Sequence, residues 1–96
     1  MKTLLDFKKI EKISKALGDP YRLQIIELIK KYGTTCMQCS DIVGTLTLSQ
    51  PAISHHIKLL VEADLLIAEK EGRTMRYTIN KDVFADYAQY LNSFQK

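Results

Sequence analysis

Residues 49–60 contain the side chains with the clearest chemical potential in this sequence. At about 100° per residue of a helix, the hydrogen-bonding side chains of this segment gather on one face and the aliphatic ones on another. The polar face comprises Gln50, Pro51, Ser54, His55 and Lys58. The aliphatic face comprises Ile53, Ile57 and Leu60, flanked by Ala52, His56 and Leu59. A helix that docks by one face and presents short donors and acceptors on the other suits the reading of base edges in the major groove of DNA.

The alternative interpretation of this segment is an ordinary amphipathic surface helix. Such helices usually carry Glu and Lys toward solvent, whereas this polar face has no acidic residue. The segment alone leaves both interpretations open, and the elements around it favour DNA recognition.

Length and composition set the limits of what this chain can be. A chain of 96 residues predicts one small domain, and 46% hydrophobic with 26% charged residues is typical of a globular protein. The net charge of +3 gives only a small general attraction to phosphate, which a dimer would double. No apolar run approaches the ~20 residues that span a bilayer, and the first residues lack the apolar region of a signal peptide. We therefore expect a cytoplasmic protein whose two cysteines are reduced.

Helical periodicity predicts two helices before the polar segment, over residues 5–17 and 20–32. Gly18, Asp19 and Pro20 separate them, because they suit a helix end, an N-cap and a first helical position. The apolar positions of the first helix are Phe7, Ile10, Ile13 and Leu17, next to Ser14. The predicted buried set of the second is Leu23, Ile26, Leu28 and Ile29.

A short helix over residues 39–46, with Ile42, Val43 and Leu46 inward, is predicted to precede the polar segment. Ser49 is the expected N-cap of the recognition helix, which should end near residues 63–64. Thr47 stands where many helix-turn-helix turns carry glycine. A β-branched residue at positive φ would be strained, so either this turn adopts another conformation or the register differs locally.

The pattern then changes to that of a β-hairpin and a last helix. Residues 65–70 and 74–79 read as strands, joined by a turn at residues 71–73 with Gly72 and Arg73 at its tip. Asn80 is the expected N-cap of a helix that runs to about Phe94. Its apolar stripe comprises Val83, Phe84, Tyr87, Ala88 and Leu91, with Tyr90 and Phe94 beside it.

The predicted fold is therefore mainly α with a small β-hairpin, in the order helix-helix-helix-helix-strand-strand-helix. This is a winged helix-turn-helix arrangement, predicted as a single domain over residues 1–96, with the helix-turn-helix at about 39–63 and the wing at about 65–79. The wing can lay Arg73 and Arg76 along a phosphate backbone or minor groove. The alternative is that both arginines serve only solubility.

Three stretches together resemble the arsenic-repressor-type (ArsR/SmtB) family of winged-helix transcriptional regulators. They are residues 16–26, which contain Asp19-Pro20-Tyr21-Arg22-Leu23, residues 48–60 and residues 71–77. The resemblance implies a homodimeric repressor that occupies a palindromic operator in double-stranded DNA and leaves it when an effector binds. Family members meet bases with residues matching Gln50, Pro51, Ser54 and His55. The full set of expected DNA contacts is Ser49, Gln50, Pro51, Ser54, His55, Lys58, Arg73 and Arg76.

The resemblance also implies a dimer built on the first and last helices, at about residues 5–17 and 81–94. The residues expected to bury against the second protomer are Leu4, Phe7, Ile10, Tyr87, Tyr90, Leu91 and Phe94. The plain interpretation of the aromatic stripe is an intramolecular core. For so small a domain we expect an interface instead.

Two effector locations are usual in metal-sensing members of this family. The last helix offers Asp82, Asp86, Gln89 and Asn92 but no His or Cys, which does not suit zinc. The other location is a Cys-x-Cys-Asp stretch on the third helix. Aligned on Asp41-Ile42, the cysteine positions of the family fall on Gln38 and Ser40, whereas Cys36 and Cys39 stand at other registers.

Cys36 and Cys39 form a Cys-x-x-Cys pair that could sense thiol oxidation or bind a soft metal or metalloid. The alternative is one buried cysteine, Cys39, and one incidental loop cysteine. His55 and His56 cannot coordinate the same metal ion, because neighbouring helical residues point about 100° apart. We therefore predict no metal site beyond this cysteine pair.

The leading hypothesis is a sequence-specific DNA-binding repressor. The second is a winged helix used only for protein interaction or dimerisation, against which the acid-free polar face and the arginines of the wing argue. Enzyme activity is not expected, because the sequence shows no cofactor loop, paired carboxylates or nucleophile-base constellation.

Overall fold

The computed structural model of this protein describes residues 5–31 and 46–95. The first part of the chain forms helices α1 (Phe7–Leu17), α2 (Pro20–Lys31) and α4 (Gln50–Glu62). The second part forms strands β1 (Leu66–Glu71) and β2 (Thr74–Ile79), helix α5 (Lys81–Asn92) and a 3-10 turn, η1 (Ser93–Gln95). This order confirms the predicted winged helix-turn-helix fold, while the short helix predicted at residues 39–46 lies outside the described residues except for its last position.

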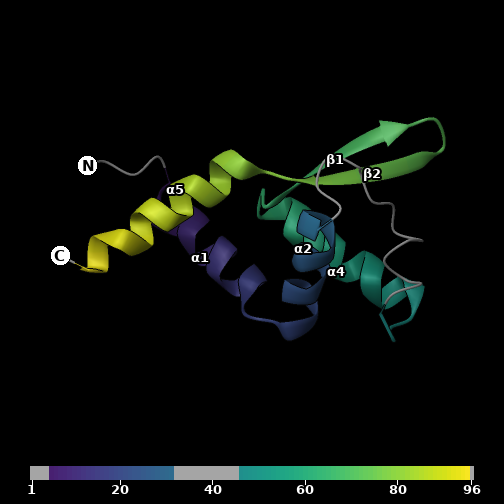
Figure 1. Ribbon diagram of the computed structural model, residues 1–96, viewed down its shortest axis with the longest axis horizontal. Helices are drawn as coiled ribbons and strands as arrows, with labels where there is room; N and C mark the ends of the chain where they lie inside the picture. The colour runs from purple at the N-terminus through teal and green to yellow at the C-terminus, as the bar shows by residue number, and fades with distance from the viewer. Residues whose placement is uncertain (1–4, 32–45, 96) are drawn as a thin grey trace.

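The elements are arranged around α2 and α4 (Figure 1). The hairpin extends from this group toward one end of the molecule, and α5 leads away toward the other end, beside α1. The two strands are antiparallel, with Leu66 opposite Ile79 and Glu71 opposite Thr74. The predicted hairpin with Gly72 and Arg73 at its tip is confirmed, but its first strand covers residues 66–71 and not 65–70, so the turn has two residues and not three.

The core is almost wholly aliphatic and joins all three helices of the first part to the start of the hairpin. Its buried members are Ile13, Ala16, Ile25, Ile26, Ile29, Ile53, Ile57, Leu60, Ala63, Leu65 and Leu66. The predicted aliphatic face of α4 is confirmed, because Ile53, Ile57 and Leu60 are each at most 2% exposed.

The predicted buried set of α2 was partly wrong. Leu23 is 46% exposed, whereas Ile25 is completely buried. Helix α2 packs against α1, α4 and β2, and the face that meets them centres on Ile29. Leu23 lies roughly 120° around the helix from Ile29, so it falls at the edge of this face.

Polar side chains fix where the helices begin. The Asp6 carboxylate accepts a hydrogen bond from the backbone N–H of Lys9 (2.7 Å), so α1 begins at Phe7, slightly later than predicted. The predicted caps Ser49 and Asn80 are confirmed: Ser49 accepts from Ala52 N (3.3 Å) and Asn80 from Val83 N (3.4 Å). Thr47 does not have a positive φ, so the strain that a β-branched residue would have in a glycine-type turn does not arise.

Helix α4 ends in a Schellman turn that directs the chain into the hairpin. Asp64 lies in the left-handed region (φ 60°). Its N–H donates to the carbonyl of Val61 (2.9 Å), and the N–H of Leu65 donates to the carbonyl of Leu60 (3.0 Å). The turn places Leu65 in the core, and the Lys9 ammonium pairs with the Asp64 carboxylate on the outside.

The left-handed backbone of Asp64 generates a stability prediction. We expect the Asp64→Gly variant to be more stable than Asp64→Ala by about 1 kcal/mol, because only alanine keeps a Cβ that crowds the following carbonyl. Both variants lose the ion pair with Lys9, so the comparison isolates the backbone. Urea unfolding measures the difference, and equal midpoints for the two variants would contradict the prediction.

Candidate nucleic-acid interface

The polar face of α4 is exposed along its whole length. Ser49 caps the helix and Pro51 occupies its first turn, where a missing N–H has no cost. Because the aliphatic face is anchored in the core, the opposite face must point to solvent. The exposed side chains on it are Ser49, Gln50, Pro51, Ser54, His55 and Lys58. The structure thus brings together all the predicted contact residues of this helix.

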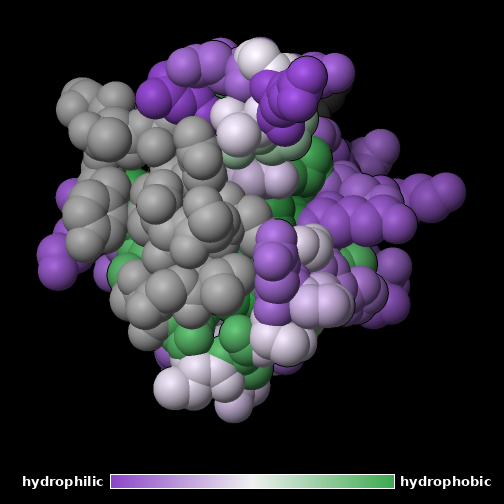
Figure 2. All heavy atoms as spheres, turned by 90° about the vertical axis from the view of Figure 1, so that its right-hand side faces the viewer, coloured by the Kyte–Doolittle hydropathy of each residue, from purple (hydrophilic) through white to green (hydrophobic). Residues whose placement is uncertain are grey.

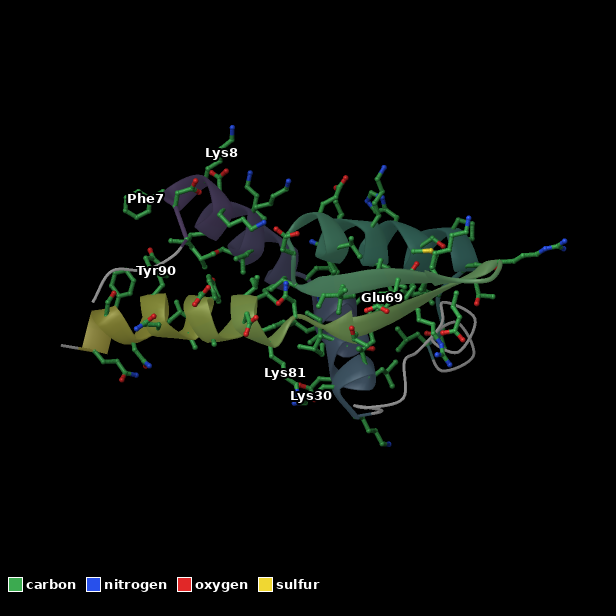
Figure 3. All side chains as sticks on the ribbon, turned by 90° about the horizontal axis from the view of Figure 1, so that it is seen from above. Phe7, Lys8, Lys30, Glu69, Lys81 and Tyr90 are labelled. Atoms are coloured by element: carbon green, nitrogen blue, oxygen red, sulfur yellow. The ribbon has the colours of Figure 1, made fainter. Side chains whose placement is uncertain are left out.

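The hairpin and the polar face of α4 lie toward the same end of the molecule. Figure 2 looks at this end, and hydrophilic residues cover the hairpin at the top of the view. Seen from above, α4 lies beside the hairpin, which it contacts through β1, and polar side chains project from its outer side (Figure 3). Helix α4 carries no acidic side chain before Glu62. Its outer face is therefore free of charge repulsion toward a phosphate backbone.

Arg22 connects the recognition helix to the end of α1. Its Nε donates to the carbonyl of Ala16 (2.7 Å), and its Nη2 donates to the carbonyl of Lys15 (3.3 Å). Its Nη1 lies 3.2 Å from Nδ1 of His56. A guanidinium can only donate, so His56 accepts this hydrogen bond. His56 is thus held on the inner flank of α4, as predicted, while His55 is left exposed on the outer face.

Sequence reasoning missed this role of Arg22. The arginine entered only as part of the stretch that resembles the family. Its position could have indicated this role. Arg22 stands three residues after the N-cap Asp19, and from there a long side chain can reach back to the last carbonyls of the preceding helix.

Asp19 holds the start of α2, and with it Arg22, in place. Its carboxylate accepts hydrogen bonds from the backbone N–H groups of Tyr21 (2.8 Å) and Arg22 (3.2 Å). Partial burial raises the pKa of Asp19, but these hydrogen bonds and the charge of Arg22 lower it by more, so the net pKa lies below the ordinary 3.8. The carboxylate is therefore ionised at neutral pH.

The tip of the wing is a tight two-residue loop. Gly72 has a positive φ (62°), a conformation that type II′ turns require at this position and that glycine adopts without strain. The Thr74 hydroxyl donates to the carbonyl of Glu71 (2.9 Å) and closes the loop. Arg73 is consequently exposed at the very tip, where it can reach a phosphate.

Arg76 is placed differently from Arg73. Its Nη1 donates to the Glu71 carboxylate (2.6 Å), and the side chain is half-buried against the hairpin. Its Nε is buried and is an unpaired donor in the part of the chain that the structure describes. The two predicted wing contacts are therefore not brought together: Arg76 would have to leave Glu71 to reach DNA.

Three of the seven residues predicted for the dimer interface are exposed in the protomer. Phe7 is 80% exposed, Leu91 48% and Phe94 71%, and α5 has no buried residue. Tyr90 contacts Phe94 edge-on with ring centroids 5.3 Å apart, and Tyr87 bonds to Ser14 of α1 through its hydroxyl (2.7 Å). Ile10 differs, because it is already buried within the protomer, and Leu4 lies outside the described residues.

The predicted thiol pair, Cys36 and Cys39, also lies outside the described residues, as do Gln38 and Ser40. Within residues 5–31 and 46–95, no three His, Cys, Asp or Glu side chains come together as metal ligands would. The described helices are too short or too polar to cross a membrane.

Comparison with known proteins decides the family. A family model described as "Bacterial regulatory protein, arsR family" matches residues 19–68, more than half of the chain. This chain belongs to the ArsR family. The arsenical resistance operon repressor of Staphylococcus aureus is 34% identical over 88 residues, covering 92% of this chain and 82% of that repressor. The transcriptional repressor SdpR of Bacillus subtilis is 30% identical, covering 85% and 88% of the two chains.

Solved ArsR-like structures share the fold of this ArsR-family chain. An ArsR-like regulator from Rhodococcus sp. RHA1 superposes with a TM-score of 0.76 at 24% identity, over 93% of this chain and 81% of that one. A homodimeric winged helix-turn-helix DNA-binding domain from Mycobacterium bovis gives 0.72 at 22%, over 92% and 80%. The expected family and fold are confirmed, and the relatives are transcriptional regulators, not enzymes.

The lowered pKa of Asp19 predicts a pH-dependent stability. A carboxyl whose pKa is lower in the folded protein stabilises it fully above the ordinary value, and the contribution is lost as pH falls through the folded value. Asp19→Ala should therefore lower the free energy of unfolding by about 1 kcal/mol at pH 7, and by less below about pH 4.

Asp19→Asn is the matched control, because asparagine also caps helices but does not titrate in this range. It should stay close to the original protein at pH 7. Urea unfolding at several pH values gives the comparison. If the loss in Asp19→Ala were the same at pH 3 and pH 7, the carboxylate would not be the stabilising form.

Proposed function

We propose that this ArsR-family regulator is a cytoplasmic, homodimeric repressor that binds a palindromic operator in double-stranded DNA and leaves it when an effector binds. The observation that carries the proposal is the exposed, acid-free polar face of α4 beside the hairpin whose tip presents Arg73. The repressors among its relatives support the same direction of regulation.

The side chains of α4 divide into base-reading and phosphate-binding groups by their chemistry. Gln50 can bond bidentately to adenine, while Ser54 and His55 offer one donor or acceptor each in the major groove. Ser49, at the helix start, and Lys58, two turns further on, suit phosphates. Arg73 adds a phosphate or minor-groove contact from the wing. Pro51 contributes apolar contact with a base.

The exposed aromatic and aliphatic side chains of α1 and α5 are proposed to form the dimer interface. Two symmetric recognition helices about 34–36 Å apart would then meet successive major grooves of a palindrome. An effector that changes this spacing or its rigidity would lower the affinity for the operator. A winged helix used only for protein interaction is the competing function, and a stable dimer that binds no DNA would establish it.

Substitutions in α4 and the wing separate base reading from phosphate binding. Gln50→Ala should weaken binding to DNA from upstream of its own gene by about 1–3 kcal/mol, roughly 5- to 150-fold, with a much smaller effect on random duplex. Arg73→Ala should weaken both and reduce the salt slope by about one. Fluorescence anisotropy at several salt concentrations measures these effects.

Gln24→Ala is the control for Gln50→Ala, because Gln24 is an exposed glutamine on α2, outside the proposed interface. It should bind both DNAs as the original protein does. Equal losses of Gln50→Ala on specific and random DNA would remove its base-reading role.

The dimer proposal is tested by charging the aromatic stripe. Leu91→Lys places a cation among the apolar side chains of α5 and should convert the dimer into a monomer with weaker operator binding. Ile67→Lys, a matched change at an exposed aliphatic residue of β1, should leave the dimer intact. Analytical ultracentrifugation reports the oligomeric state, and an unchanged dimer in Leu91→Lys would place the interface elsewhere.

A further inference from the structure

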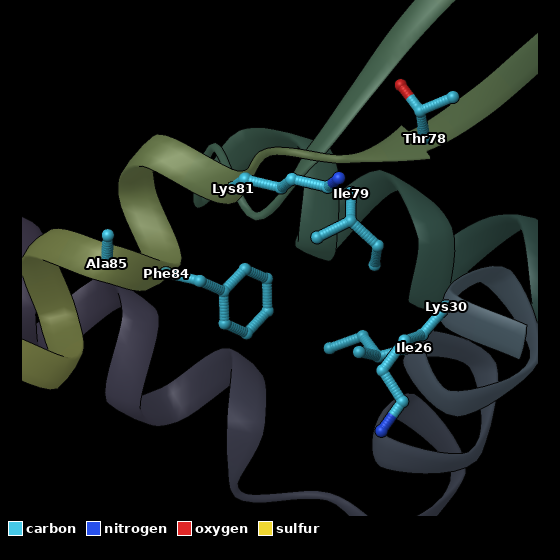
Figure 4. Close-up of a pocket in the computed structure, with 7 residues that line it drawn as sticks. All are labelled: Ile26, Lys30, Thr78, Ile79, Lys81, Phe84 and Ala85. Atoms are coloured by element: carbon cyan, nitrogen blue, oxygen red, sulfur yellow. The ribbon is translucent and has the colours of Figure 1, made fainter. Parts of the chain in front are cut away.

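An apolar groove of about 800 Å³ opens between α2, β2 and the first turns of α5. It is lined by Ile26, Lys30, Thr78, Ile79, Lys81, Phe84 and Ala85. Figure 4 shows Ile26, Ile79 and Phe84 directed toward one another around the opening, with Lys81 along one edge and Lys30 at the other. The volume lies within the range of about 300–1,000 Å³ that small-molecule sites occupy.

The two lysines at the edges are not equivalent. Lys30 pairs with Glu27 of its own helix (2.9 Å), so its charge is already balanced. Lys81 has no hydrogen-bond or ion-pair partner among residues 5–31 and 46–95. Its ammonium stands at the edge of an otherwise apolar opening. An occupant with an apolar body and one anionic group would complement both features.

The groove borders the proposed dimer stripe, which comprises Tyr87, Tyr90, Leu91 and Phe94. At about 100° per residue, Lys81 and Ala85 centre roughly 150° away from this stripe, whereas Phe84 points within about 20° of Leu91. A dimer formed through the stripe would therefore meet the groove at Phe84 and leave its Lys81 side open. The charge of Lys81 on that open side favours a small anionic ligand over the apolar face of a second copy of the chain.

The groove lies between α2, the end of the wing and the start of α5. Ile26 belongs to α2, which Arg22 ties to the recognition helix through His56. Ile79 ends the wing, and Asn80, the next residue, bonds to the Leu65 carbonyl (3.0 Å) and caps α5. A ligand wedged between these elements would alter the angle of α5 relative to α2 and the wing.

We propose that this groove is the effector site and that it binds a small amphipathic carboxylate, with the anionic group at Lys81 and the apolar body against Ile26, Ile79 and Phe84. The effector role rests on the proposed repressor function, whereas the binding itself does not. Binding that favours one conformation of the groove lowers operator affinity, and by reciprocity the operator lowers carboxylate affinity by the same factor.

Decanoate, below its micelle concentration, is the probe. Calorimetric titration of the full chain should give saturable binding, tighter than that of decan-1-ol, which has the same chain without the charge. Lys81→Met removes the charge but keeps an apolar stem, and it should weaken decanoate binding about fivefold or more and abolish the preference over the alcohol. Lys12→Met, at an exposed lysine of α1, is the control and should bind decanoate normally.

Ala85→Trp tests the groove by filling it. Ala85 is exposed, so the larger side chain can be accommodated without disturbing the core, and the urea midpoint verifies folding. This variant should lose decanoate binding. Decanoate should reduce operator affinity of the original protein but not that of Ala85→Trp.

Several results would overturn the proposal. The site would be refuted if decanoate showed no saturable binding, or if its binding were unchanged in both Lys81→Met and Ala85→Trp. Loss of the dimer in Ala85→Trp would instead show that the groove is an interface between copies of the chain. Binding with the expected dependence but no effect on operator affinity would remove the effector role alone. A protein that never binds its upstream DNA would refute the repressor function, and the calorimetric result would still decide whether the groove binds carboxylates.

Discussion

The burial of three aliphatic side chains on α4 is the constraint on which the rest of this structure depends. Ile53, Ile57 and Leu60 recur at spacings of four and three residues and are almost completely buried. Each such burial stabilises by about 1.5–3 kcal/mol. Rotating the helix by one residue, about 100°, would bury polar side chains in their place. The orientation of the polar face, and hence what the protein can present to DNA, is fixed by the core and not by the polar residues themselves.

Two further devices hold α4 at its ends and flank. The Schellman turn at Asp64 brings Leu65 into the same core, so the hairpin starts at a defined angle from the helix. Arg22 spans from the last carbonyls of α1 to His56 and so links the flank of α4 to the end of α1. Both devices satisfy backbone groups that a helix end leaves unpaired. The same hydrogen bonds thus end the helices and fix the orientation of the polar face of α4.

Much of this arrangement could be predicted because its causes are local. The caps at Ser49 and Asn80 and the tip of the hairpin at Gly72 follow from residue types at fixed positions. Burial in α2 was predicted less well, because the exposure of Leu23 depends on which three elements surround the helix. The ion pair between Arg76 and Glu71 was not predicted, because the sequence of a strand does not show whether an arginine will pair with a neighbouring acid or stay available for a ligand. The family was indicated by the combination of three stretches, whereas the order of the elements and the polar face of α4 followed from the periodicity of the sequence alone.

Helix α5 is packed at its start and uncovered toward its end. Its first turns pack Val83 and Phe84 against the core, while its later turns leave Leu91 and Phe94 uncovered. Because a helix turns about 100° per residue, positions 81 and 85 point away from positions 87, 90, 91 and 94, and position 84 lies at the border between the two sets. A second protomer on one side and a ligand on the other would both contact the same helix. Asn80 is the single residue between β2 and α5. A small change in the angle of α5 would therefore be transmitted directly to the wing, which presents Arg73. The short junction between β2 and α5 would therefore allow a ligand in the proposed groove site to change the position of the wing relative to DNA.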